Sequence, residues 1–195
     1  ETCPHNLYLT HDHLEKYGSW VTFSPPVRNA DTASSLWNQL KKDYIFTVGS
    51  DHGPVEKKLK EMGTSNIWKG QYGIPGAETL VPLMLNAVSE GRLSLEQITG
   101  LLSENPARLY GLYPQKGIIQ IGSDADFTVV DMNSTYSLNA ENMQTSCGWI
   151  PYEGWEITGK VVYTILRGSP IMKFGEITGE PGYGKFIRRR NNFAL

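Results

Sequence analysis

The fold of this chain is decided by the stretch YIFTVGSDHGP, residues 44–54. Its first five residues are all β-branched or aromatic, the composition of a short strand covered on both faces. Gly49 ends this run, and Gly53-Pro54 turns the chain away. Asp51 and His52 therefore fall at the carboxyl end of a predicted buried strand, where α/β barrels place catalytic groups. An aspartate here would also suit a capping residue, so its interpretation depends on the flanking motifs.

Size and composition indicate a soluble globular protein. The chain has 195 residues, 39% hydrophobic and 19% charged, with a net charge of −2. This charge gives no electrostatic case for nucleic acid, and no apolar stretch approaches the length that spans a membrane. Cys3 and Cys147 lie far apart without metal-like spacing, which favours reduced thiols in a cytoplasmic protein. Because the first residue is Glu1 rather than Met, we expect a fragment of a longer protein.

Residues 1–112 are predicted to alternate short strands with helices. We expect strands near residues 1–9, 20–23 and 44–50, and a long loop over residues 52–76 that carries Lys57, Lys58 and Lys60. The helical segments are residues 10–18, 29–42 and 77–90, followed by helices that open at Ser94 and Asn105.

From residue 113 to residue 195 short strands replace the helices. The predicted strands cover residues 117–122, 125–131, 160–167 and 170–174, so we place a domain boundary at residue 112. The two strands near residues 1–9 and 44–50, each followed by a helix, cannot close a barrel even with the β appendage. The sequence therefore predicts an α/β chain whose missing strands come from a larger protein or from a partner.

Five stretches, in their order and spacing, resemble the carboxyl-terminal half of a cyclic amidohydrolase. That group contains hydantoinase (dihydropyrimidinase), allantoinase and dihydroorotase. The stretches are ETCPH at 1–5, SPPVR at 24–28, GSDHGP at 49–54, NPARLYGL at 105–112 and GSDAD at 122–126. The resemblance implies the last part of a TIM-like metallo-dependent (β/α)₈ barrel over residues 1–112. It also implies part of a small β-sandwich over residues 113–195.

The resemblance assigns roles to three residues. Asp51 matches the carboxylate after the eighth barrel strand, which binds a metal and moves a proton from the attacking water to the leaving amide nitrogen. Ser24 and Gly76 match positions beside the backbone groups that hold the cyclic substrate. The implied cofactor is a divalent metal, as binuclear zinc. Its remaining ligands, which are histidines and a carboxylated lysine, would precede Glu1, so this chain alone is expected to be inactive.

The histidines carry separate expectations. His11 and His13 lie beyond the seventh strand of the implied barrel and are expected to be a surface pair. His5 either lines the site or packs in the core, and both interpretations stay open. His52 adjoins Asp51 in the sequence and is expected to help orient its carboxylate.

An allantoinase-like enzyme acting on a small cyclic amide or ureide is our first interpretation, because the chain carries CPH at 3–5 and SDHGP at 50–54. Hydantoinase is the close alternative. Dihydroorotase is disfavoured, because Ser24 and Val55 stand where that enzyme usually has asparagine and histidine. A non-catalytic hydantoinase-like scaffold and an independent small β/α binding domain remain hypotheses from other classes. The resemblance also implies a homo-oligomer, or dependence on the missing amino-terminal half.

Overall fold

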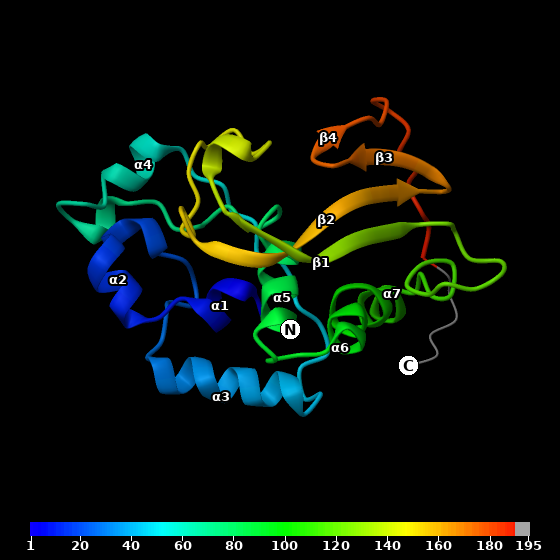
Figure 1. Cartoon of the computed structure of the whole chain (residues 1–195). Helices are drawn as coiled ribbons and strands as arrows, with labels where there is room; N and C mark the ends of the chain where they lie inside the picture. The colour runs from blue at the N-terminus through cyan, green and yellow to red at the C-terminus, as the bar shows by residue number, and fades with distance from the viewer. Residues whose placement is uncertain (190–195) are drawn as a thin grey trace.

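The computed structural model describes residues 1–189 and combines a helical part with one antiparallel sheet (Figure 1). Its strands are β1 (Phe127–Ser137), β2 (Glu156–Leu166), β3 (Ser169–Lys173) and β4 (Glu176–Ile177). Its α-helices are α1 (Pro4–Tyr8), α2 (His11–Tyr17), α3 (Ala30–Lys41), α4 (Lys57–Glu61), α5 (Leu80–Ser89), α6 (Leu95–Thr99) and α7 (Asn105–Leu109). Short 3₁₀ turns cover Gly18–Val21, Ile67–Lys69 and Ala140–Asn142, and a π-helical turn covers Gly100–Glu104.

Helix starts follow the capping signals of the sequence. Helix α6 begins after Ser94, which forms a reciprocal capping box with Gln97, and α2 begins after Thr10 in the same way. Asn29 caps α3 by accepting a hydrogen bond from the backbone of Thr32 at 2.9 Å. Each of these side chains satisfies a backbone N–H that has no partner inside the helix, which is why the predicted helices start where they do.

The four strands form an antiparallel sheet in the order β1-β2-β3-β4. Strands β2 and β3 pair directly around Arg167 and Gly168, which confirms the predicted strand pair there. Helix α5 packs against β2, and Asn86 Oδ1 accepts a hydrogen bond from the backbone of Thr158 at 2.9 Å. The strand predicted for residues 117–122 is wrong: these residues form turns and bends, with local hydrogen bonds such as Ser123 N to Gln120 O.

Three parallel contacts join segments of the first part. Single bridges pair Thr2 with Val48, Thr10 with Arg28, and His52 with Ile74. The strands expected near residues 1–9 and 44–50 are therefore reduced to single bridges, and residues 4–8 are helical. The strand expected near residues 20–23 is wrong, because Gly18–Val21 form a 3₁₀ turn. Proline is favoured at the first position of a helix, which explains why α1 begins at Pro4 directly after the bridge at Thr2.

Two apolar clusters form the core, and the segment of residues 7–9, at the end of α1, contributes to both. Leu7 packs with Trp37 and Met84 in one cluster, whereas Leu9 packs with Phe23 and others in the second. This arrangement anchors the beginning of the chain between the helices and the sheet. Within residues 1–189, none of the helices has the length and apolar character needed to cross a membrane.

Candidate functional site

The candidate site lies where the bridged segments end. We call this region the site rim and define it as residues 1–5, 22–24, 49–53 and 74–77. The backbone N–H of Thr2 donates to Thr47 O at 3.1 Å, and that of Gly49 donates to Thr2 O at 2.9 Å. These two bonds are the slanted pairing of parallel strands, and they bring residues 3–5 beside residue 51.

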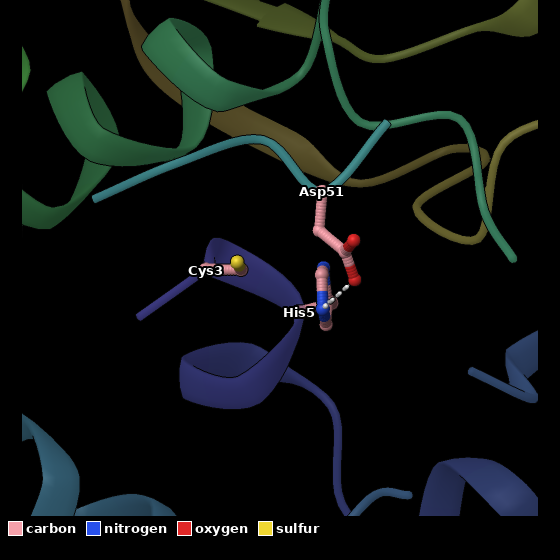
Figure 2. A group of neighbouring side chains, drawn as sticks. All are labelled: Cys3, His5 and Asp51. Carbon is pink, nitrogen blue, oxygen red and sulfur yellow. Dashed lines mark ion pairs between the residues drawn. The ribbon is translucent and has the colours of Figure 1, made fainter. Parts of the chain in front are cut away.

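Asp51 projects from this rim into accessible space. Its side chain is 54% exposed, and its Oδ2 lies 3.4 Å from Nε2 of His5. Its backbone adopts φ 45°, in the left-handed region. That region is uncommon for a residue with a side chain, although aspartate tolerates it better than most. The turn therefore sends the carboxylate away from the buried segment that precedes it, and Figure 2 shows it directed toward His5.

His5 is both a core residue and a member of the site. It is 1% exposed, and its ring packs edge-on against Phe23 with 4.3 Å between the ring centroids. Burial lowers the pKa of His5 to about 4, against an opposing effect of Asp51. The imidazole is therefore neutral at pH 7, so its contact with Asp51 is not an ion pair at that pH. Its buried Nε2 has no hydrogen-bond partner among the described residues, which is a costly state for a polar atom.

Cys3 completes a cluster with these two residues (Figure 2). The thiol sulfur, an imidazole nitrogen and a carboxylate oxygen all lie within 4.8 Å of one another. Burial, together with the charges of Asp51 and Glu1, raises the pKa of Cys3 to about 11. The thiol is therefore protonated at pH 7 in the absence of a cation. Within residues 1–189, no other group of three or more such side chains meets the same geometric condition.

These donors fit a divalent transition metal. The strongest sign is the buried, unpartnered Nε2 of His5 facing an exposed carboxylate. Nitrogen, sulfur and carboxylate oxygen are the donor types that zinc accepts in proteins. The expectation of a metal at Asp51 is thus compatible with the surroundings of its carboxylate.

Gly76 lies against the Asp51 loop. A Cβ atom at this position would sit 2.3 Å from the carbonyl oxygen of Ser50, the residue before Asp51. The N–H groups of Gly76 and Ala77 both donate to Nδ1 of His52, at 3.1 and 3.0 Å. His52 therefore holds the 76–77 segment rather than the carboxylate of Asp51, which corrects the role expected for it.

Ser24 also belongs to the site rim and comes directly after buried Phe23. Its side chain is exposed, and Phe23 carries the ring that packs against His5. His11 and His13 belong to α2, where Nε2 of His11 lies 3.0 Å from Val27 O and His13 takes part in the helix cap. His11 is exposed and His13 is half-buried, and neither belongs to the group formed by Cys3, His5 and Asp51.

Two charged residues, Lys60 and Glu78, support the rim, and sequence reasoning assigned this role to neither of them. Lys60 is fully buried, and its Nζ donates to Thr22 O at 3.0 Å and to Thr22 Oγ1 at 3.2 Å. Burial lowers the pKa of Lys60 to about 8. Glu78 accepts hydrogen bonds from the backbone N–H groups of Gln144 and Thr145, each at 2.8 Å. Burial alone would raise the pKa of Glu78, but the hydrogen bond from the Thr145 hydroxyl and the two backbone bonds outweigh it and lower the pKa. Lysine and glutamate in a loop normally signal a solvated surface, so only the tertiary contacts reveal them.

Comparison with known proteins gives concordant matches. The model of the amidohydrolase family matches residues 13–170. The chain is 42% identical to L-hydantoinase from Paenarthrobacter aurescens over 98% of its own length and 42% of that protein. It is 41% identical to an allantoinase from Enterococcus faecalis, over 96% of the chain and 41% of the relative. It is 37% identical to a dihydroorotase from Pyrococcus furiosus, over 97% of the chain and 43% of the relative.

The solved structures agree with these sequence matches. The structure of L-hydantoinase (dihydropyrimidinase) from Arthrobacter aurescens superposes with a TM-score of 0.93 at 40% identity, covering 95% of this chain and 42% of that one. The chain therefore spans about two fifths of the length of the curated relatives that it matches.

Proposed function

Because the chain belongs to the amidohydrolase family, we propose that it supplies the carboxyl-terminal part of a metal-dependent enzyme that hydrolyses a C–N bond of a cyclic amide or ureide. One observation carries this proposal: the exposed carboxylate of Asp51 lies at the end of a parallel-bridged segment and faces the unpartnered Nε2 of His5. A carboxylate in this position is accessible to a substrate and to a metal ion.

Asp51 is the catalytic residue of the proposal and one ligand of the metal. A divalent cation bound there supplies Lewis acidity to the amide carbonyl and lowers the pKa of water. The Asp51 carboxylate accepts the proton of the attacking water and passes it to the nitrogen that leaves when the C–N bond breaks. Its 54% exposure supports this role, because a carboxylate sealed in the core could not reach the substrate.

Backbone groups near Ser24 and Gly76 hold the ring in this proposal. Both residues belong to the site rim, Ser24 after the Phe23 that packs on His5 and Gly76 against Ser50. The tight approach at Gly76 supports its assignment, since a side chain there would displace the loop that carries Asp51.

The proposed architecture is a (β/α)₈ barrel completed by the amino-terminal half of a longer protein. Residues 1–112 would form its last part, and residues 113–195 part of a β-sandwich, with residues 190–195 outside the described structure. An apolar groove of about 700 Å³ between α5–α7 and the sheet supports a missing amino-terminal half. An exposed apolar surface of this kind is usually covered by another segment or partner. Ile119 and Ile121, which are 80% and fully exposed, lie in the same part of the chain and support a cover there or a homo-oligomer.

The substrate we propose first is allantoin, with hydantoin as the close alternative and dihydroorotate as the third. The identities of 42%, 41% and 37% to the three kinds of relative do not separate these substrates. The metal centre we propose is binuclear zinc, with its other ligands outside this chain. Free Cys3 and Cys147 support a cytoplasmic location for the enzyme.

A substrate panel tests the proposal. The full-length protein is assayed side by side with allantoin, hydantoin, dihydrouracil and dihydroorotate, before and after removal of metal by a chelator. We expect hydrolysis of at least one ring, loss of activity after chelation, and recovery with zinc. A protein that binds about two divalent ions per chain but hydrolyses none of the four would contradict the substrate class. A protein that binds no metal would favour the non-catalytic scaffold.

A further inference from the structure

A buried lysine joins two segments of the chain at the site rim. Lys60 belongs to helix α4 (Figure 1), which packs against the turn formed by Gly18–Val21. Its Nζ donates to the carbonyl oxygen of Thr22 at 3.0 Å and to Thr22 Oγ1 at 3.2 Å. The backbone N–H of Gly73 donates to the same carbonyl oxygen at 3.0 Å. Helix α4 and the end of the loop over residues 52–76 therefore share one acceptor, Thr22 O.

The two segments that meet at Thr22 O lead to the residues beside which the ring is held in the proposed function. Ser24 follows Thr22 closely in the chain, and Gly76 follows Gly73. The second connection is held in place because the N–H of Gly76 donates to Nδ1 of His52 at 3.1 Å. A shift of Thr22 O would therefore change the spacing between the two sides of the ring-binding region.

The surroundings of the Lys60 amine fix its position. Thr22 Oγ1 donates its own proton to Ser19 O at 2.7 Å, so its oxygen accepts from Nζ. The backbone carbonyl of Lys60 accepts a hydrogen bond from Ser19 Oγ at 2.8 Å, which holds α4 to the same turn at a second point. Nζ also lies 5.4 Å from the centroid of the Trp149 ring, within the range of a cation–π contact. The amine is thus surrounded by groups that the fold holds in place.

A charged amine at this position costs stability. Within residues 1–189 no ion pair includes Lys60, which is fully buried. Burial lowers the pKa of Lys60 to about 8. An ammonium group buried against neutral oxygens is unfavourable, and an apolar side chain of similar size would avoid this cost. Proteins keep destabilising groups of this kind where activity depends on them, which indicates a functional role for Lys60.

We propose that Lys60 is a positioning residue: by holding Thr22 O in contact with Gly73 N–H, it sets the spacing between residues 22–24 and residues 73–76. The inference rests on the proposed function, in which these two segments hold the substrate ring, and adds a residue that itself touches no substrate. Backbone groups that hold the ring do so alike in the ground state and the transition state. Loss of Lys60 should therefore raise KM and leave kcat nearly unchanged.

Steady-state kinetics of Lys60→Met in the full-length protein test this role. Methionine fills most of the buried volume and removes the hydrogen-bond donor. For the ring that the parent protein hydrolyses best, KM should rise at least about tenfold and kcat should change less than about threefold. Lys58→Met, at an exposed lysine of the same helix, is the matched control and should change neither constant. A fall in kcat at unchanged KM, or equal changes in the two variants, would overturn the inference.

Hydrogen exchange at the Gly73 amide gives a readout that does not depend on hydrolysis. Because this N–H donates to Thr22 O, Lys60→Met should speed its exchange at least about tenfold, as measured by mass spectrometry of peptides that contain residue 73. Peptides from β2 should keep their rates, which excludes a general loss of stability. Equal rates at Gly73 in Lys60→Met and Lys58→Met would overturn the inference. If the parent protein hydrolyses no ring, the proposed function fails, and these exchange rates alone decide whether Lys60 couples the two segments.

Thr22→Val provides a second variant, which decides the question if Lys60→Met does not fold. It removes one of the two oxygens that Nζ contacts and keeps Thr22 O, so KM should rise about threefold. Faster exchange at Gly73 should accompany this rise. A KM and a Gly73 exchange rate equal to those of the parent protein would overturn the inference.

Discussion

The site rim and the four-stranded sheet are held together in different ways. The sheet is continuous, with successive strands pairing antiparallel, so each strand needs only its sequence neighbour. The rim instead joins residues 1–5 to residues 49–53 through one parallel bridge, and it depends on supports such as Lys60 and Gly76. The comparison teaches that local pairing builds the scaffold, whereas the chemistry depends on contacts between distant segments. Changes at the rim should therefore affect activity, and changes on the sheet should affect little.

The largest effect is expected at Asp51. Asp51→Asn keeps the shape of the side chain and removes the group that accepts the proton, so kcat of the full-length enzyme should fall about 10²–10⁴-fold. The free energy of unfolding should change by less than about 0.5 kcal/mol, because the side chain is exposed. Steady-state kinetics and denaturant unfolding measure the two quantities.

Asp43→Asn is the matched control for this variant. Asp43 is also an exposed aspartate with positive φ, at 57°, but it lies outside the rim. Its variant should retain the activity of the parent protein. Equal losses in the two variants would show that the backbone conformation matters and the Asp51 carboxylate does not.

The next largest effect is a pH dependence of the free energy of unfolding that arises from buried Lys60. Burial lowers its pKa to about 8, compared with the ordinary lysine value of 10.5. Between these values the unfolded state binds more protons than the folded state, so stability contributed through Lys60 rises with pH across that window. Below pH 8 the amine is charged in both the folded and the unfolded state, so burying its charge costs the full free energy. Above pH 10.5 the amine is neutral in both states, and this cost is absent. The rise should amount to at most about 3 kcal/mol.

Lys60→Met isolates this contribution. The difference in unfolding free energy between the parent protein and Lys60→Met should increase from pH 8 to pH 10.5 in denaturant titrations. Lys58→Met changes an exposed lysine of the same helix and should give a flat difference. A flat difference for Lys60→Met as well would mean that this amine does not lose its proton in the fold.

A third change acts on the close approach at Gly76. Gly76→Ala places a methyl group 2.3 Å from Ser50 O and should destabilise the protein by about 1–3 kcal/mol. Displacement of the adjoining Asp51 should lower kcat about tenfold or more, because small misplacements of catalytic groups are costly. Gly184→Ala, which meets no atom within 4 Å, is the control. Unchanged thermal unfolding and kcat in Gly76→Ala would contradict the tight packing of the rim.

The smallest effect is expected on the sheet. Thr135 and Thr158 face each other across β1 and β2, with their hydroxyl oxygens 2.9 Å apart. Thr135→Val removes this exposed hydrogen bond and should cost about 0.5 kcal/mol or less, without changing kcat. If Thr135→Val lost as much activity as Gly76→Ala, the distinction between the sheet as scaffold and the site rim as the functional region would be contradicted.

The sequence predicts the four-stranded sheet and the site rim to different extents. Two short strand-like runs on either side of Arg167 and Gly168 identified the β2–β3 pair, and the capping pattern of Ser94 with Gln97 identified α6. These signals are local, so a single sequence contains them. Asp51 was found because a strand-ending carboxylate is also a local pattern, reinforced by the family motifs. Its exposure follows from a turn that the neighbouring GSDHGP motif already indicates.

Contacts between distant residues were not predictable in this way. Cys3 was set aside because it has no metal-like spacing to Cys147, yet folding brings it beside Asp51. The role of His52 was misassigned because sequence adjacency to Asp51 says nothing about where its ring nitrogen points. Lys60 was taken with its neighbours as part of a loop patch, although α4 buries it against Thr22. In each case a tertiary contact overrides the meaning of the local sequence.

Anomalous X-ray diffraction from crystals of the zinc-loaded full-length protein tests the central claim most directly, because it locates metal independently of activity. The account predicts a zinc peak about 2.0–2.2 Å from a carboxylate oxygen of Asp51. Zinc sites in the protein that all lie away from the Asp51 carboxylate would contradict it.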